Sequence, residues 1–156
     1  KWTEIKKINP KLRLHMIGKL QTNKVKFAVK LFDYIHSVDS EKLAKKISEE
    51  EKKINKKVKI FIQVNIGDED QKSGINKNQL TSFYLYCKQL ELDVIGLMCI
   101  PPNNKNSADY FKEMQLLTKK HQFSELSMGM SSDYIDAAKN FATFLRIGSS
   151  IFGQRD

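Results

Sequence analysis

Residues 58–66 read VKIFIQVNI, a short run in which β-branched and apolar side chains dominate. Such a run is typical of a strand inside a parallel sheet, where helices cover the outer face. The polar segment at residues 67–74 follows directly, and its two glycines and three acidic side chains indicate a loop. The rest of the sequence is therefore expected to supply further strands and the helices that cover them.

Apolar segments and helical patterns alternate on both sides of this strand. We predict strands at residues 12–17, 32–38, 92–100, 125–130 and 143–147, and helices at residues 22–31, 40–55, 77–91, 107–120 and 134–141. Regular alternation of this kind favours an α/β fold with parallel strands. By itself it does not distinguish an open doubly wound sheet from a barrel.

Small polar residues mark the expected helix starts. Thr22 and Ser40 are placed to cap the helices at residues 22–31 and 40–55. Three further N-cap candidates precede the helix at residues 134–141: Ser131, Ser132 and Asp133. The helix at residues 40–55 should turn one apolar face inward, formed by Leu43, Ala44, Ile47 and Ile54.

Composition indicates a single globular domain over residues 1–156. No apolar run is long enough to span a membrane, so no membrane partner is expected. Cys87 and Cys99 form no CxxC pair, which makes a reducing, cytoplasmic setting the default. The net charge of +9 could indicate a nucleic-acid binder, but only three of the 27 basic residues are arginines. The lysines alternate with glutamates as on a solvated helix face, so we expect no nucleic-acid partner.

Two hydroxyl-rich turns carry the densest functional signal. SMGMSS at residues 127–132 and RIGSS at residues 146–150 each follow an apolar segment and lead toward a helix start. Backbone N–H groups and serine hydroxyls in such turns can bind an anion, and (β/α)8 barrels commonly bind phosphate at the loops after their last two strands. The alternative is that these serines only cap helices.

Arg146 lies within the apolar segment FLRIG at residues 144–148. A charged side chain in such a strand must face a polar cavity or find a buried partner, because burying it alone is costly. The alternative is an exposed arginine on an edge strand.

The other candidate groups are weaker. His15 alternates with apolar residues, and a lone strand histidine is more often packed or hydrogen-bonded than catalytic. His36 has Ser37 and Asp39 nearby, but their spacing does not match a hydrolase triad. No metal-ligand spacing, dinucleotide fingerprint or P-loop occurs in the sequence.

A series of motifs resembles one family. It comprises HMIGKLQTNK at 15–24, IHSVDS at 35–40, QVN at 63–65, KSG at 72–74, GLMCIP at 96–101, LSMGMS at 126–131, LRIG at 145–148 and IFG at 151–153. This series is similar to the pyridoxal 5′-phosphate homeostasis proteins, the YggS/PROSC family, which share the alanine racemase N-terminal barrel. The resemblance runs over about residues 12–156.

The resemblance implies a parallel (β/α)8 TIM-type barrel of which this chain covers about strands 3–8. It also implies a protein that binds pyridoxal 5′-phosphate in cofactor homeostasis and is not an enzyme, with no catalytic residue and no metal. The cofactor-binding residues carried over by motif are Ser127, Met130, Ser131, Arg146, Gly148 and Ser149. Among these, Ser131 and the backbone of Gly148 and Ser149 would hold the phosphate, and Arg146 would face the pyridine nitrogen.

One departure from the family concerns the lysine that forms its Schiff base, in a Val-Ser-Lys-like motif on the first strand. No such motif occurs here, and neither Lys19 nor Lys24 matches it. We therefore expect this lysine and two strands to precede Lys1, which is not an initiator methionine, or a second copy to complete the barrel. An amino-acid racemase or decarboxylase of the same fold is the alternative function. It needs a second domain, which we do not expect after Asp156, and we expect the full-length form to be a monomer.

Overall fold

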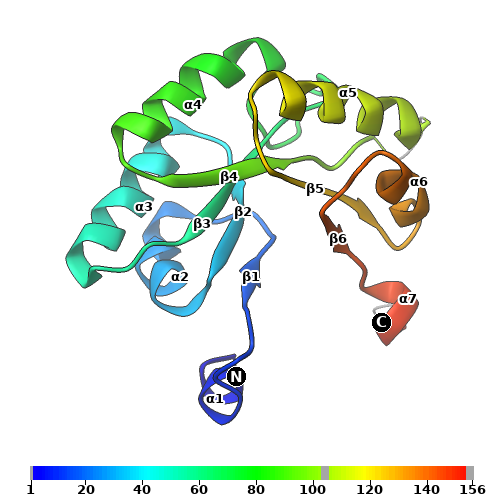
Figure 1. Cartoon of the computed structure of the whole chain (residues 1–156). Coiled ribbons are helices and arrows are strands. Elements are labelled where there is room, and N and C mark those ends of the chain that lie inside the picture. The colour runs from blue at the N-terminus through cyan, green and yellow to red at the C-terminus, as the bar shows by residue number, and fades with distance from the viewer. Residues whose placement is uncertain (1, 103–105, 154–156) are drawn as a thin grey trace.

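The computed structural model describes residues 2–102 and 106–153 and contains an α/β fold built on parallel strands. The strands are β1 (His15–Met16), β2 (Tyr34–Val38), β3 (Lys59–Gln63), β4 (Asp93–Met98), β5 (Glu125–Met130) and β6 (Phe144–Arg146). They lie in the sheet in chain order, and every neighbouring pair is parallel. Within the described residues they form an open, curved sheet, part of a TIM-type barrel, as expected (Figure 1).

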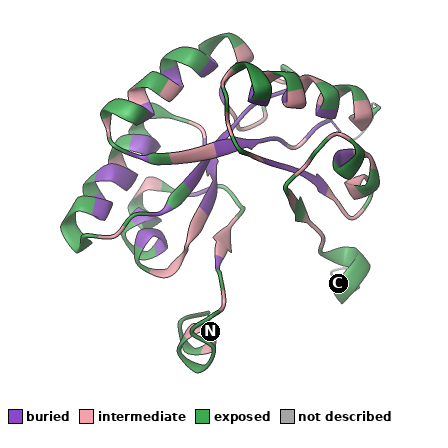
Figure 2. Cartoon of the chain, viewed as in Figure 1, coloured by how far each residue is buried: buried purple, intermediate pink, exposed green. Residues whose placement is uncertain are grey.

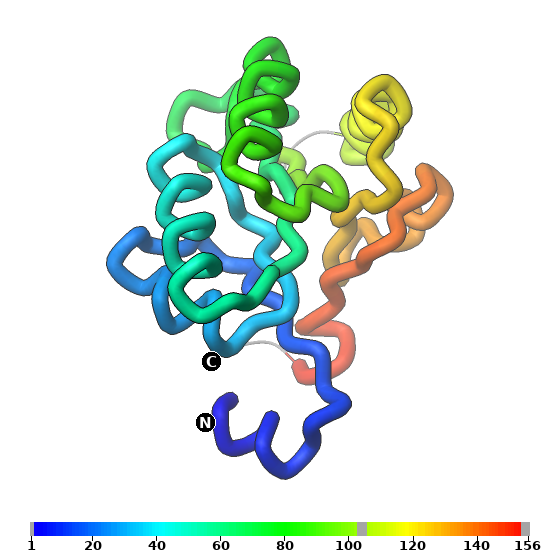
Figure 3. The backbone as a smooth tube through the Cα atoms, turned by 60° about the vertical axis from the view of Figure 1, so that its left-hand side comes forward, coloured from blue at the N-terminus to red at the C-terminus, as the bar shows by residue number. Residues whose placement is uncertain are grey.

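Helices cover the outer side of this curve, except for the first and the last helix, which lie near the two ends of the chain (Figures 1 and 3). The helices are α1 (Trp2–Ile8), α2 (Val25–Leu31), α3 (Glu41–Ile54), α4 (Leu80–Gln89), α5 (Ser107–Lys120), α6 (Tyr134–Lys139) and α7 (Ser149–Phe152), with the 3-10 turns η1 (Thr22–Lys24) and η2 (Lys77–Gln79). In the described parts of the chain, none of these helices has the length and apolar composition that a bilayer span needs.

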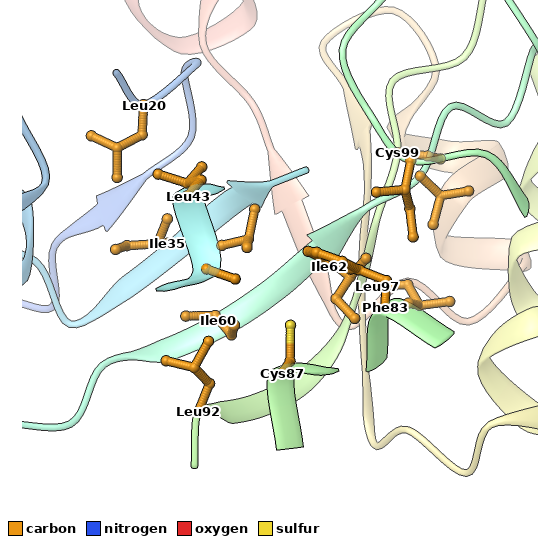
Figure 4. Close-up of a cluster of buried hydrophobic side chains, with 14 of the residues drawn as sticks. Leu20, Ile35, Leu43, Ile60, Ile62, Phe83, Cys87, Leu92, Leu97 and Cys99 are labelled. Carbon is orange, nitrogen blue, oxygen red and sulfur yellow. The ribbon is translucent and has the colours of Figure 1, made fainter. Parts of the chain in front are cut away.

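The main hydrophobic core lies between the sheet and these helices. On β3, Ile60 and Ile62 point to the helix side and pack in one cluster with Leu43 of α3 and Phe83 of α4 (Figure 4). Phe61 lies between them on the strand, faces the inner side of the curve and is also fully buried. Burial on both faces explains why the segment at residues 58–66 is almost continuously apolar. The buried strand residues lie in the central strands β2–β5, whereas β1 and β6 at the sheet edges contain none (Figure 2).

Helix α3 begins as its sequence predicts, because the Ser40 hydroxyl accepts a hydrogen bond from the Leu43 N–H at 3.4 Å. It ends at Asn55, which adopts the left-handed conformation with φ of 49°. Leu43, Ala44 and Ile47 are buried, as expected. Ile54, the last residue of α3, is 45% exposed, so its predicted place on the buried face is wrong.

The segment at residues 22–31 differs from the prediction of one helix capped by Thr22. Thr22 opens the 3-10 turn η1, α2 follows it, and the N-cap positions belong to Gln21 and Lys24, neither with a side-chain cap. The C-terminal carbonyls of α2 are instead bound by a distant side chain. Lys56 Nζ donates to the carbonyl oxygens of Val29, at 2.7 Å, and of Phe32, at 2.8 Å. A long-range contact, absent from the local pattern, therefore stabilises this helix.

The N-terminal part of the described chain also departs from expectation. The predicted strand at residues 12–17 shortens to the two residues of β1, and the preceding helix α1 was not predicted. Helix α1 spans only seven residues and buries none of them, so its apolar spacing is too short a signal to identify a helix. Lys6 attaches it to the fold, because its Nζ lies 2.6 Å from a carboxylate oxygen of Asp33 and 3.2 Å from the Leu31 carbonyl oxygen.

Candidate functional site

The carboxyl ends of the last three strands bring the two predicted turns together. Strand register pairs Met98 of β4 with Ser127 of β5, and Met130 of β5 with Arg146 of β6. Because parallel strands end at the same edge of a sheet, the turns after β5 and β6 are neighbours there. Ligand sites of barrel folds lie at this edge.

A cavity of about 600 Å³ opens between these two turns. Its lining residues are Met130, Ser131, Ser132, Arg146, Gly148, Ser149, Phe152 and Gly153. They include five of the six residues that the motifs single out. The sixth, Ser127, is fully buried and lies behind the cavity wall, where it contacts Arg146. The volume is in the range of pockets that hold small molecules.

The Ser131 hydroxyl joins the two turns. Its oxygen accepts hydrogen bonds from the backbone N–H groups of Gly148, at 3.2 Å, and Ser150, at 3.3 Å. Since those bonds occupy only the oxygen lone pairs, the hydroxyl proton is left to donate to a ligand. Ser131 therefore binds the turn that opens α7 and does not cap α6, which corrects its predicted role as an N-cap.

The N-cap position of α6 belongs to Asp133, one of the three candidates. Its carboxylate does not bond to the first N–H groups of α6, but accepts from the Met130 N–H at 2.7 Å. Ser132 occupies no cap position and lines the cavity. Asp133 thus fixes the end of β5, where the strand turns toward the cavity.

Arg146 both faces the cavity and has buried partners. Its Nη1 donates to the Ser127 hydroxyl oxygen at 2.9 Å, and its Nη2 donates to the Cys99 carbonyl oxygen at 2.8 Å. Burial lowers the pKa of Arg146 from its ordinary value, but a guanidinium remains charged in proteins. The exposed-arginine alternative is therefore wrong. Arg146 is the charged group among the residues that line the cavity.

Two histidines continue this set of contacts across the inner side of the sheet. His36 Nδ1 lies 2.9 Å from the Ser127 hydroxyl oxygen, and His36 Nε2 lies 3.0 Å from His15 Nδ1. We call His15, His36, Ser127 and Arg146 the Arg146 network. His15 is hydrogen-bonded, as its sequence context indicates. His36 meets a serine 91 residues away, a contact that the sequence reasoning missed.

Strand parity could have placed both side chains on the inner face, although it does not identify the contact between them. Side chains two residues apart on a strand point to the same face. His36 therefore shares the inner face with Tyr34 on β2, and Ser127 points to the inner face from β5. The Ser127–His36 pair is not a hydrolase dyad. Ser127 is fully buried and accepts a hydrogen bond from Arg146, and the other partner of His36 is a histidine rather than a carboxylate.

His36 is neutral at physiological pH. Burial, followed by the nearby charges of His15 and Arg146, lowers its pKa to about 3. Its ring stacks on Phe61 with the ring centroids 4.3 Å apart. Burial also raises the pKa of the Cys99 thiol to about 12, so this cysteine is protonated. The described residues contain no group of three His, Cys, Asp or Glu side chains placed to hold a metal ion.

The lowered pKa of His36 predicts that the protein loses stability as pH falls below about 6.5. Below that pH, His36 is protonated in the unfolded chain but stays neutral in the folded protein. The free energy of unfolding should therefore decrease by roughly 2 kcal/mol between pH 7.5 and pH 5. Urea unfolding at the two pH values measures this. His36→Asn should show a much shallower dependence. An equal dependence in both proteins would place the titrating group elsewhere.

The comparisons with known proteins agree with one another. The alanine racemase N-terminal domain family matches residues 3–156. The chain is 38% identical to the pyridoxal phosphate homeostasis protein of Aquifex aeolicus, over 92% of this chain and 68% of that protein. It is also 38% identical to the protein of the same name from Vibrio cholerae, over 95% of this chain and 67% of that one.

Solved structures extend the comparison. PipY of Synechococcus elongatus, with PLP bound, has a TM-score of 0.88 and 31% identity, over 97% of this chain and 75% of PipY. Alanine racemase of Clostridium difficile has a TM-score of 0.75 at 16% identity, over 98% of this chain and 42% of the racemase. The second likeness concerns the fold alone. The chain spans about two thirds of the length of its curated relatives.

Proposed function

The chain belongs to the family of pyridoxal phosphate homeostasis proteins, which share the N-terminal domain of alanine racemase, and on that premise we propose that it binds pyridoxal 5′-phosphate and acts in homeostasis of this cofactor without catalysing a reaction. One observation carries the proposal. The cavity between the turns after β5 and β6 combines the Ser131 hydroxyl and the Gly148 turn with the guanidinium of Arg146.

The residues of this cavity fit a phosphorylated ring. We propose that the phosphate binds to the Ser131 hydroxyl and to the backbone at Gly148 and Ser149, with Met130 beside it. Hydroxyl and backbone N–H donors are typical phosphate ligands. Arg146 would then face the ring nitrogen with its remaining N–H groups, while Ser127 supports Arg146 from behind.

Arg146 would also affect the chemistry of the bound ring. When bound, pyridoxal phosphate supplies an electron-withdrawing ring, and that property is strongest when the ring nitrogen is protonated. An arginine has only N–H donors, so it favours a nitrogen that carries no proton. The alternative is an amino-acid racemase or decarboxylase of this fold. Turnover of an amino acid above roughly 1 per second with added pyridoxal phosphate would favour that alternative.

The basic surface is better explained by ion pairs than by a nucleic-acid partner. On α3, Glu50 accepts from both Lys46 and Lys53, each at 2.8 Å, and pairs at this helical spacing stabilise a helix. We propose accordingly that nucleic acid is not a partner. We also propose that the full-length form is a monomer. Cys87 and Cys99 are buried free thiols, which supports the proposal of a cytoplasmic setting.

Ser131→Ala is expected to weaken the binding of pyridoxal phosphate by about 1–2 kcal/mol, or roughly fivefold to thirtyfold. The variant loses the hydroxyl proton offered to the phosphate and the oxygen that positions the Gly148 turn. Calorimetric titration with pyridoxal phosphate, pyridoxal and inorganic phosphate measures this. Pyridoxal, which lacks the phosphate, should bind both proteins equally weakly.

The matched control is Ser82→Ala, which removes an exposed serine hydroxyl on α4. It should bind all three compounds as the unmodified chain does. Equal affinities for pyridoxal and pyridoxal phosphate would contradict a phosphate site, and unchanged binding by Ser131→Ala would place that site elsewhere.

A further inference from the structure

The positions of the protons in the Arg146 network determine which group donates in each of its hydrogen bonds. A guanidinium only donates, so the Ser127 oxygen must accept the bond from Arg146 Nη1. The single Ser127 proton is then free to donate to its other neighbour, His36 Nδ1, at 2.9 Å. The opposite arrangement, with a proton on His36 Nδ1, would leave a buried hydroxyl proton without a partner, which costs free energy.

The direction continues to His15. A neutral imidazole with an unprotonated Nδ1 carries its proton on Nε2, and His36 Nε2 lies 3.0 Å from His15 Nδ1. His36 therefore donates to His15, which accepts on its own Nδ1. In each hydrogen bond of the Arg146 network, the residue nearer to Arg146 thus donates and the next residue accepts.

Packing keeps the members of the network in place. His36 is 1% exposed and Ser127 is fully buried. The rings of His15 and Tyr34 stack with centroids 4.2 Å apart and planes 2° from parallel, and Phe144 lies edge-on to His36 at 5.8 Å. Neither imidazole can turn over without displacing these aromatic neighbours. The Ser127 hydroxyl thus presents its oxygen to Arg146 from a fixed position.

We propose that Ser127 and His36 are positioning residues that orient the Arg146 guanidinium toward the cavity and select ligands whose facing ring atom is a hydrogen-bond acceptor. This inference rests on the proposed function, and it identifies two residues that control how the cavity binds the ring of the ligand. The Cys99 carbonyl oxygen holds Nη2 and the Ser127 oxygen holds Nη1, so the guanidinium plane is set before any ligand enters. Preorganisation of this kind reduces the entropy lost on binding.

Two changes at His36 separate a positioning role from a merely structural one. In His36→Asn, the amide oxygen can accept from Ser127 at the place of Nδ1, whereas in His36→Leu nothing can accept there. We expect His36→Leu and Ser127→Ala to weaken pyridoxal phosphate binding about tenfold and to change inorganic phosphate binding less than about twofold. His36→Asn should restore most of the lost affinity.

A buried serine outside the site provides the matched control. Ser48 is 3% exposed, and its hydroxyl donates to the Leu90 carbonyl oxygen at 2.9 Å. Ser48→Ala removes one buried hydrogen bond, as Ser127→Ala does, and should leave both ligand affinities unchanged. If Ser127→Ala weakens phosphate as much as pyridoxal phosphate, or if His36→Asn binds as poorly as His36→Leu, the positioning role is overturned.

The ligand-free protein gives an independent readout. Long-range nitrogen–proton NMR spectra should show His36 with its proton on Nε2, and nitrogen relaxation should show the Arg146 side chain to be rigid, then mobile in Ser127→Ala. A proton on His36 Nδ1, or an equally rigid Arg146 in that variant, would overturn the inference even if a substituted protein failed to fold. If the unmodified chain binds no pyridoxal phosphate, the proposed function fails, while these spectra still decide the orientation of Arg146.

Discussion

Gly96→Ala is expected to lower the free energy of unfolding by about 3 kcal/mol or more. Gly96 lies on β4 opposite Glu125 of β5. A β-carbon at this position would clash with the Glu125 carbonyl oxygen and lie only 2.6 Å from its carbonyl carbon. Both atoms belong to backbone, so neither can rotate away, and the two strands would have to separate. Urea unfolding of the purified variant measures the loss.

Gly18→Ala is the matched control, because a β-carbon at the exposed Gly18 has nothing within 4 Å. Its stability should stay within about 1 kcal/mol of the unmodified chain. Cys99 directly follows β4 and Ser127 lies on β5, and both are partners of Arg146. Strand separation in Gly96→Ala should therefore also reduce pyridoxal phosphate binding. Equal stability of the two variants would show that the sheet relaxes at Gly96 without cost.

The sequence prediction is accurate where a local sequence pattern determines the element, and it fails where a long-range contact does. The predicted limits of α5 (Ser107–Lys120) and β5 (Glu125–Met130) agree with the structure residue for residue. Amphipathic periodicity or a compact apolar run determines such elements. The helix α1 is too short to show a clear periodicity, and it lies against the fold through the contact of Lys6 with Asp33, which no local pattern encodes.

The same division applies to the site. The residues of the two turns could be named from the sequence, because small hydroxyl residues after strands indicate anion binding and the motifs resemble a known family. The contacts within the site could not be predicted, since Ser131 and Gly148 are 17 positions apart in the sequence and a single hydroxyl joins them. His36 and Ser127 are still farther apart in sequence, and strand parity places each on the inner face without naming its partner.

Arg146→Met should have the second large effect, and on both stability and binding. Methionine fills much of the arginine volume but donates no hydrogen bond, so the Ser127 and Cys99 oxygens lose their donor. Leaving buried polar groups without a partner costs about 1–3 kcal/mol each, and we expect a total loss of about 2–4 kcal/mol in unfolding free energy. Pyridoxal phosphate binding should weaken by at least about tenfold, because the group that faces the ring is removed.

Two further substitutions separate charge from geometry in this result. Arg146→Lys keeps the positive charge, but its single nitrogen cannot reach both oxygens in the fixed fork of a guanidinium. It should therefore restore only part of the pyridoxal phosphate affinity that Arg146→Met loses, and leave inorganic phosphate binding close to that of the unmodified chain. Arg13→Met removes an exposed arginine and should leave both affinities and stability unchanged. If Arg146→Lys binds pyridoxal phosphate as the unmodified chain does, the contribution of Arg146 is its charge alone, and the orientation set by Ser127 and Cys99 is not needed for binding.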